Sequence, residues 1–430
     1  MTPKKHLFMT SFILLVANCM VSCQTKLPPE YKEWIDPVIP GDLPKVSFYE
    51  SVNDFNAFAL ESYANIIHSN KDENIVYSPY AMAIDMEILR LGAHGKTARN
   101  IEKCLLLPAS FDIDSTQLPL FEYTPPSPQK EPAIHYPPVF LLNHSIWFSD
   151  QIRLRKGYRE RTTRDYHVEF FPVDFSLPST IILKEMNNWC YKSFQGKAPP
   201  IISPLPNDTT FWLLGTLYFK AHWKNKFQHH KTQDRNFTLI SGETVLVPVM
   251  QESVFNFKYT EDDDVQVLEM PYFSGESGDF SMLFFLPKVT DGILEFETEF
   301  NVNKYETLIN SLQDKKVEVF IPKFSIEQET DLTEIVEDEF WINSDFSDMI
   351  EPPVPNIYKA KATQRISLAI DEHGTEVSLL AQIGYVSLDN ENPIFDADHP
   401  FMFAIREMNT SAILFLGRIM NPVRLSETFE

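Results

Sequence analysis

The stretch Ile370–Phe401, IDEHGTEVSLLAQIGYVSLDNENPIFDADHPF, decides how the rest of the chain is interpreted. Runs typical of β-strands flank it, Arg365–Ile370 before it and Phe401–Arg406 after it. Between these runs the sequence shows neither a capped helical stripe nor a two-residue hairpin turn. Connections this long without structure of their own are uncommon in compact domains and are usually functional or disordered. Because the stretch is rich in apolar side chains, it is unlike a solvated tail, and it predicts an exposed loop that can become a strand.

Length and composition favour a globular protein with a large core. The chain has 430 residues, of which 43% are hydrophobic and 13% are aromatic. This length allows one large domain or several ordinary ones. A formal net charge of −23, without a sustained Lys/Arg tract, argues against nonspecific binding to nucleic acid or to an anionic membrane.

Residues 1–23 are predicted to be a secretory signal peptide that does not belong to the fold. Lys4 and Lys5 form a positive n-region, Leu7–Val16 is a short apolar segment, and small or polar residues follow near Cys23. We therefore expect the protein to be secreted and extracellular. The alternative is a bacterial lipoprotein signal, in which acylated Cys23 would anchor the protein to a membrane. No later run reaches the about 20 apolar residues of a transmembrane helix.

Two cysteines, Cys104 and Cys190, remain after the signal peptide. Two cysteines do not make a disulfide framework, and the sequence leaves open whether they pair or stay free. Asn-x-Ser/Thr triplets agree with secretion and mark candidate glycosylation sites. Their asparagines are Asn143, Asn207, Asn236 and Asn409.

Helical patterns dominate the first half of the chain and strand patterns the second. Helices are predicted at 51–67, 78–91, 96–105, 153–166, 181–194, 302–312 and 330–340. Strands are predicted at 74–77, 139–148, 210–219, 237–239, 245–250, 255–259, 265–270, 281–286, 316–322, 365–370 and 412–420. Since strands and helices do not alternate, the order predicts an α+β protein and disfavours a doubly wound parallel sheet. Two proline-rich segments, 24–48 and 108–138, are predicted to be an irregular leader and an exposed insertion.

Residue patterns typical of enzymes are absent from the sequence. It contains no G-x-S-x-G, H-E-x-x-H, Walker or G-x-G-x-x-G motif. His229-His230 has only Asp234 nearby as a third metal ligand, and we interpret it as a surface pair. Asp371-Glu372-His373 offers acid and base groups but no nucleophile, and we interpret it as a polar turn. No metal, cofactor or enzymatic activity is predicted.

Several segments resemble the serpins along nearly the whole mature chain. NIVYSPYAMAIDMEILRLGAHGKT (Asn74–Thr97) and GKAPPIISPLPNDTTFWLLGTLYFKAHWKNKF (Gly196–Phe227) are similar to the family's second helix and to its central strand. Shorter similarities are VPVMQ (Val247–Gln251), VLEMPY (Val267–Tyr272), FFLPK (Phe284–Lys288), VFIPKFSIEQETDL (Val319–Leu332), DEHGTE (Asp371–Glu376), HPFMFAI (His399–Ile405) and FLGRIMNP (Phe415–Pro422). Each is weak alone, but together, in the family's order, they identify the chain as a divergent member.

The resemblance implies a single serpin-like domain over 49–425, followed by a short tail at 426–430. Its fold would be α+β, with three mixed or antiparallel sheets. Residues 371–398 would be the reactive-centre loop, which is a bait for a serine protease and inserts into a sheet as an extra strand after cleavage.

The family's spacing places the cleaved bond between Leu388 and Asp389, fourteen residues beyond Gly374. Tyr385 is the alternative bait residue. Leucine at this position suits a serine protease with an apolar primary pocket, such as a chymotrypsin-like enzyme. The inhibitor itself is expected to be a monomer.

Insertion requires a hinge with small side chains, because bulky ones must find space between packed strands. The hinge Gly374-Thr375-Glu376 follows the family, whereas Val377 and Leu379 are larger than the residues that inhibitory members carry there. Overpacking typically costs about 1–3 kcal/mol per site. If the inward face has room, both side chains would instead add burial.

The polar cluster that controls sheet opening in the family is altered here. Ser78 is present, whereas Ala81, Gly215 and Gln364 replace the usual serine, asparagine and histidine. Two functions stay open. The hinge and the loop length favour a suicide-substrate inhibitor, whereas the bulky residues and the altered cluster favour a non-inhibitory binding or carrier protein.

Overall fold

The apolar run 211–219 lies at the centre of the protein, as its uninterrupted hydrophobic pattern predicts. In the computed structural model it belongs to β5 (Phe211–His222), in which every residue except Lys220 is buried. A strand buried on both faces lies inside a sheet that has a covering layer on each side. The structure describes residues 51–69, 72–107, 138–193, 205, 211–273, 279–331, 344–351, 360–375 and 392–423.

The helix that matters most for the site is α3 (Pro79–Gly92). The side chain of Ser78 caps it by accepting from the backbone N–H of Ala81, and Pro79 occupies the first turn. All its residues except Leu91 are buried, so α3 runs through the core. The other helices are α2 (Val52–Ser69), α4 (Gly95–Cys104), α5 (Lys156–Tyr166), α6 (Ser179–Ser193), α7 (Ile293–Glu299) and α8 (Val302–Asn310), with a 3-10 turn at His229–Lys231.

β5 belongs to a six-stranded sheet, which we call the main sheet, with the order β11-β13-β14-β5-β2-β4. Its other strands are β2 (Val139–Ser149), β4 (Glu169–Val173), β11 (Phe324–Asp331), β13 (Ala360–Asp371) and β14 (Gly374–Thr375). β13 and β5 are parallel neighbours, whereas β2 is antiparallel to β5 and β11 is antiparallel to β13. The main sheet is therefore mixed.

A second sheet has the order β1-β17-β16-β9-β8-β7-β10-β15, and β6 also pairs with β7. Its strands are β1 (Ile75–Tyr77), β6 (Gln233–Thr238), β7 (Thr244–Glu261), β8 (Val265–Pro271), β9 (Phe280–Pro287), β10 (Gln313–Pro322), β15 (Ile394–Asp396), β16 (Phe401–Glu407) and β17 (Ile413–Ile419). Only the β10–β15 pair is parallel among these described pairings. A third, two-stranded sheet joins β3 (Arg153–Leu154) to β12 (Ile350–Glu351).

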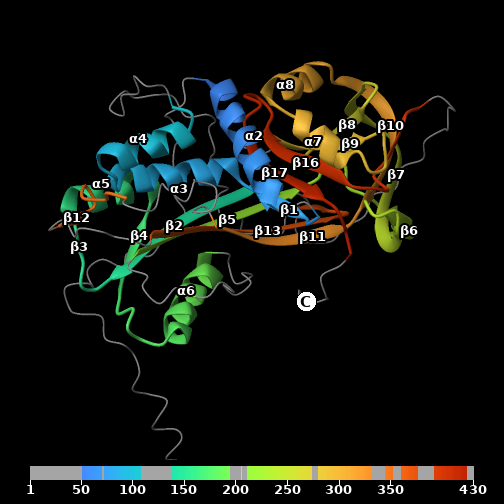
Figure 1. Cartoon of the computed structure of the whole chain (residues 1–430). Coiled ribbons are helices and arrows are strands. Elements are labelled where there is room, and N and C mark those ends of the chain that lie inside the picture. The colour runs from blue at the N-terminus through green and yellow to red at the C-terminus, as the bar shows by residue number, and fades with distance from the viewer. Residues whose placement is uncertain are drawn as a thin grey trace, which may run out of the picture. The chain divides into compact units, whose positions relative to one another are not determined.

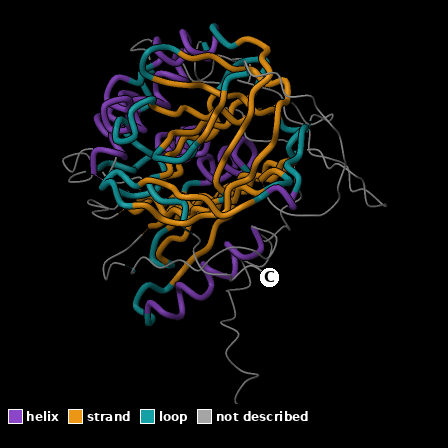
Figure 2. Tube along the Cα trace, turned by 90° about the vertical axis from the view of Figure 1, so that its right-hand side faces the viewer, coloured by secondary structure: helices purple, strands orange, loops and turns teal. Residues whose placement is uncertain are grey.

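Helices lie on both faces of the main sheet (Figure 1). α6 packs on one face, where Trp147, Trp189 and Trp212 belong to a small apolar cluster. α3 lies on the opposite face, and its apolar side chains belong to the large core. Figure 2 shows the strands in orange from a second direction, with helix α6 below them. This arrangement confirms the predicted α+β class.

Two predicted helices have wrong boundaries, in both cases because of contacts with distant residues. Thr330 is predicted to open a helix but lies near the end of β11, beside Glu329, which forms an ion pair with Arg365 of β13 at 3.3 Å. Arg155 is predicted inside a helix, but its N–H donates to the carbonyl of Met349 at 2.8 Å, and α5 begins only after it. Pairing with a neighbouring strand outweighs helix propensity at both places. Residues 332–340 lie outside the described part.

Cys104 and Cys190 do not form a disulfide with each other, which answers the question that the sequence leaves open. Cys190 lies in α6 against the main sheet, and burial raises the pKa of its thiol to about 12. Among the described residues, no helix combines the length and the apolarity needed to cross a membrane.

Candidate functional site

The predicted loop leaves the main sheet at the end of β13 and joins the second sheet at β15. The structure describes the loop up to Thr375 and again from Asn392. The remaining predicted site residues lie outside the described residues, and their roles stay predictions. They are Glu376, Val377 and Leu379 of the hinge, and Leu388 and Asp389 of the reactive bond.

The first hinge residues form the short strand β14 between β13 and β5. Thr375 lies opposite Ile370 of β13 and opposite Ala221 of β5. β14 is antiparallel to both neighbours, which pair directly with each other further along as parallel strands. The main sheet is therefore closed along most of its length and holds the start of an additional strand at one end.

Only glycine fits at position 374. Its φ of +142° is a conformation that side-chain-bearing residues rarely adopt. A Cβ there would meet the carbonyl oxygen of Ala221 and would lie 2.7 Å from the Cα of His222. These are backbone atoms of β5, which cannot turn aside. Gly374 thus allows β14 to approach β5 closely enough to pair with it.

A buried carboxylate, Glu372, anchors the hinge. It is 1% exposed. Its Oε2 accepts a hydrogen bond from Lys323 Nζ at 2.8 Å, and its Oε1 accepts one from Thr232 Oγ1 at 2.7 Å. His229 Nδ1 lies 3.0 Å from the same Oε1. Burial alone would raise the pKa of Glu372, but the hydrogen bonds from Lys323 and Thr232 outweigh it and hold the pKa at about 2.

This low pKa predicts a specific loss of stability in acid. A carboxyl group whose pKa is lowered by folding contributes stability above its ordinary pKa of 4.5 and loses that contribution as the pH falls towards about 2. We expect Glu372→Gln to lower the free energy of unfolding by about 3 kcal/mol at neutral pH. Denaturant titrations of both proteins from about pH 7 to about pH 2 measure the difference, which should vanish in acid. A difference that stays constant with pH would contradict this role.

A stacked aromatic pair supports the turn that precedes the hinge. The rings of Trp223 and Tyr272 stack with centroids 4.6 Å apart and planes inclined by 6°. Trp223 Nε1 donates to the carbonyl of Asp371 at 2.9 Å, and its backbone N–H donates to the carbonyl of His373 at 2.8 Å. Both carbonyls of the turn are thereby fixed on a rigid, buried surface.

The turn also gathers the titratable groups that the sequence singles out. The ligand atoms of Asp371, Glu372 and His373 lie within 4.8 Å of one another, a spacing that suits a metal ion. However, Glu372 already accepts from Lys323, and an ammonium at that distance opposes a cation. His229 is largely exposed, as a surface residue should be, but its ring contacts Glu372. We therefore interpret Asp371, Glu372 and His373 as charged residues that hold the hinge in place, and not as metal ligands.

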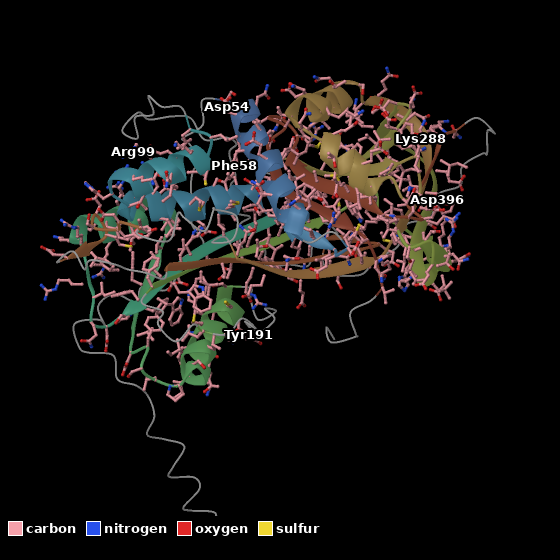
Figure 3. All side chains as sticks on the ribbon, in the orientation of Figure 1. Asp54, Phe58, Arg99, Tyr191, Lys288 and Asp396 are labelled. Carbon is pink, nitrogen blue, oxygen red and sulfur yellow. The ribbon has the colours of Figure 1, made fainter. Side chains whose placement is uncertain are left out.

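The far end of the loop is held by a second ion pair. Arg235 of β6 approaches Asp396 of β15 with an Nη2–Oδ2 distance of 2.7 Å, and its guanidinium lies 4.2 Å from the centre of the Phe320 ring. Figure 3 shows Asp396 on the side of the molecule where β6 and β7 lie. The described residues thus fasten the near end of the loop to the main sheet and to Lys323 and Thr232, and the far end to the second sheet.

The predicted sheet-opening residues come together beneath the middle of the main sheet. Gln364 of β13 lies opposite Gly215 of β5. Gln364 Oε1 accepts from the N–H of Ser78 at 3.0 Å, and Gln364 Nε2 donates to the carbonyl of Ser78 at 3.2 Å. Ala81 contributes its backbone N–H to Ser78 Oγ at 3.2 Å. The cluster is altered, but it still ties β13 to the start of α3.

Sequence reasoning misses two residues of this cluster. Asp85 of α3 and His144 of β2 are both 0% exposed, and 3.3 Å separates His144 Nε2 from Asp85 Oδ1. A Cβ on Gly215 would lie 2.7 Å from Asp85 Oδ2, so the carboxyl group fills the space beside the glycine. An aspartate in the middle of the apolar helix sequence Met82–Leu89 is the available signal.

The candidate glycosylation asparagines have different surroundings. Asn236 in β6 and Asn409 in the turn after β16 are exposed, whereas Asn143 is half-buried within β2. Asn207 lies outside the described residues. Asn409 Nδ2 also donates to Glu407 Oε1 at 2.8 Å. Asn236 and Asn409 are therefore the described candidates that a glycan could reach.

Comparisons with known proteins give a consistent result. The family model described as Serpin (serine protease inhibitor) matches residues 53–422. Leukocyte elastase inhibitor A of Mus musculus is 30% identical over 385 residues, which cover 85% of this chain and 97% of that protein. An uncharacterized serpin-like protein of Thermococcus kodakarensis is 29% identical over 382 residues, which cover 86% and 85%. The native structure of tengpin, a thermophilic serpin, has a TM-score of 0.74 at 20% identity and covers 86% of this chain and 94% of its own.

Proposed function

Because this chain belongs to the serpin family, we propose that it is a secreted inhibitor that traps a serine endopeptidase as a suicide substrate. The family consists mostly of protease inhibitors, and one relative carries the name leukocyte elastase inhibitor. The observation that carries the proposal is β14, because its two residues already occupy the entrance between β13 and β5.

β14 fixes the direction in which the rest of the loop would enter. A strand antiparallel to both β5 and β13 continues between them if they separate. Each step of two residues along the loop then moves two residues back along each neighbour. Starting from Thr375 opposite Ala221, this register brings Ala381 opposite Gly215. Counting along β13 gives the same row, because Gln364 lies opposite Gly215.

The same register suits the bulky hinge residues. Val377 would lie beside Phe219 and Leu379 beside Leu217, and both neighbours belong to the large apolar core. Ala381, whose side chain is a single methyl group, would lie opposite Gly215, where the carboxyl group of Asp85 leaves little space. We infer that the two large residues add burial on insertion.

The bait residue suggests the target class. Leu388 would occupy the primary pocket of the protease, and leucine fits a pocket lined by apolar side chains. We therefore propose a serine endopeptidase of chymotrypsin-like or elastase-like specificity as the partner. The bond to be cleaved joins Leu388 to Asp389.

Replacing Thr375 by arginine should abolish trapping without preventing cleavage. Position 375 lies on the row of the buried residues Ile370 and Ala221, so an arginine there would bury an unpaired charge on insertion. Denaturing gels with a panel of apolar-specific serine proteases detect the covalent complex. The native protein should form it, and Thr375→Arg should be cleaved without it.

Ser378→Arg is the matched control, because its row lies on the other face of the main sheet, where Ser367 is half-exposed and Tyr218 is 8% exposed. This variant should still trap. A complex with Thr375→Arg would contradict the insertion mechanism. Cleavage of the native protein without a complex, and without a rise in Tm, would contradict inhibition itself.

A non-inhibitory binding or carrier protein is the second candidate, and it would follow if β5 and β13 left no room for Val377 and Leu379. If these side chains cannot be accommodated, the loop would be cleaved like any exposed segment. The gel and the Tm of the cleaved protein therefore decide between the two functions.

Secretion is inferred from the signal-like residues 1–23. Mass spectrometry of the mature N-terminus tests it. An unmodified start near Cys23 supports a soluble secreted protein, whereas a lipid on Cys23 would show membrane anchoring. A glycan on Asn236 or Asn409 would agree with the first outcome in a host that attaches glycans, and a single species in size-exclusion chromatography would agree with the expected monomer.

A further inference from the structure

Two polar tethers connect the main sheet to α3, one on each side of the line along which the sheet would open. On the β13 side, Gln364 holds the backbone of Ser78 at 3.0 and 3.2 Å. On the other side, His144 of β2, which lies opposite Gly215, reaches Asp85 at 3.3 Å. Ser78 caps the same helix that carries Asp85. Since one helix holds both tethers, β5 and β13 can separate only if one of them breaks.

The Asp85–His144 tether is buried and has little other support. Both side chains are 0% exposed, and among the described residues none of their polar atoms has a hydrogen-bond partner of good geometry. Gly215 of β5 has no side chain that could bind to the pair. The neutral side chain of Gln364 on β13 is already hydrogen-bonded to the backbone of Ser78. Two residues at the end of α5 act on the pKa of His144 in opposite directions: the backbone of Tyr166 raises it, and the charge of His167 lowers it.

Burial disfavours charge on both members of the pair. It raises the pKa of Asp85 well above its ordinary value, and it lowers the pKa of His144 to about 3. Both directions indicate a neutral pair, in which the protonated carboxyl group of Asp85 lies 3.3 Å from the neutral ring of His144. A lone carboxylate or a lone imidazolium would be an uncompensated buried charge.

We propose that Asp85 and His144 form a one-proton latch that holds β2 and β5 on α3 and determines how readily the main sheet opens. The proposed function supplies the reason for opening, and the latch rests on it in that respect. When β2 and β5 move across α3, the pair separates and water reaches both groups. Asp85 and His144 then return towards ordinary pKa values of about 4 and about 6.5.

The latch should be strongest in a middle range of pH. Between about pH 4 and about pH 6.5 the open pair holds one proton, on His144, as the closed pair does, so opening is independent of pH. Above about pH 6.5 the open pair releases that proton, and the opening constant rises by up to about tenfold per pH unit. Below about pH 4 the open pair binds a second proton, and opening is again favoured.

Hydrogen exchange tests the latch without any protease. Exchange of the mature protein is followed from about pH 5 to about pH 9 and corrected for the intrinsic rate of each amide. The opening constant of the amides in 213–217 and 363–366 should rise above about pH 6.5 by up to about tenfold per unit. Asp85→Asn should remove this rise, because the closed pair then holds no proton that opening above about pH 6.5 could release. An opening constant of the native protein that is flat across this range would overturn the latch.

Glu87→Gln is the matched control. Glu87 is a carboxyl on α3 that is 1% exposed, and it differs from Asp85 in being paired with Arg90 at 2.6 Å. This variant should retain the rise above about pH 6.5. Loss of the rise in Glu87→Gln as well as in Asp85→Asn would overturn the assignment to Asp85.

A pair of steric variants keeps the test decisive even if Asp85→Asn does not fold. Gly215→Asn alone should lose most of the folded protein, because its Cβ would come within 2.7–2.8 Å of the Asp85 carboxylate oxygens. Adding Asp85→Ala should recover folding and remove the rise in exchange. A Gly215→Asn protein as stable as the native one, or a double variant that retains the rise, would overturn the latch.

The two proposals can fail separately. If no protease forms a covalent complex, the proposed function is lost, but the exchange profile of the native protein is not affected. If the profile is flat while trapping is intact, only the latch is lost.

Discussion

Gly374→Ala is expected to lose β14 and to be cleaved by its target protease without trapping it. Alanine would have to adopt a φ of +142°, and its Cβ would meet the backbone of β5 at Ala221 and His222. Strain of this kind costs on the order of 1–3 kcal/mol, and the steric overlap adds to it because backbone atoms cannot turn aside. Residues 374 and 375, which form β14, must then leave the entrance between β13 and β5. We expect the yield of covalent complex on denaturing gels to fall by at least about tenfold.

Gly95→Ala separates strain from steric overlap. Gly95 also has a positive φ, +56°, but nothing lies within 4 Å of the Cβ that alanine would add. This variant should lose about 1 kcal/mol of stability and should trap as the native protein does. If Gly374→Ala trapped equally well, insertion would not need β14, and the observation that carries the proposed function would lose its force.

Local sequence patterns are sufficient to predict the centre of the fold. The continuous apolar run at 211–219 corresponds to β5, and Ser78-Pro79 corresponds to the start of α3, because strand burial and helix capping depend on neighbouring residues. The prediction is wrong where a distant partner decides. Thr330 follows its strand neighbours on β13 and not its helix propensity, and Arg155 follows the backbone of Met349.

The same distinction between neighbouring and distant residues applies to the candidate functional site. The place of the hinge can be predicted, since Gly374 and its neighbours form a recognisable motif. The chemistry that holds the hinge cannot, because Lys323 and Thr232 lie 49 and 140 residues from Glu372 in the sequence. Likewise, Asp85 and His144 come together only once the strands are in register over α3. Their residue types are informative in retrospect, but no spacing rule connects them.

Glu372→Lys is expected to have the largest effect on stability. It removes the carboxylate that pairs with Lys323 at 2.8 Å and places a second cation in the same buried space. Breaking a buried ion pair by removing one partner typically costs about 3–5 kcal/mol. The bonds to Thr232 and His229 are lost at the same time. Denaturant unfolding at neutral pH should show a decrease in the free energy of unfolding of that size.

The consequence for the main sheet follows from where Glu372 lies. Glu372 lies two residues before β14 and fixes the turn from which the loop starts. Its loss therefore frees the C-terminal ends of β13 and β5. Strand edges exposed in this way can pair with another chain, and size-exclusion chromatography should therefore show oligomers of Glu372→Lys. The double variant Lys323→Glu with Glu372→Lys restores opposite charges and should recover about half of the lost stability. If the double variant recovered nothing, the ion pair would not be the cause, and the anchoring of the hinge would have to depend on Thr232 and on the stacked ring of Trp223.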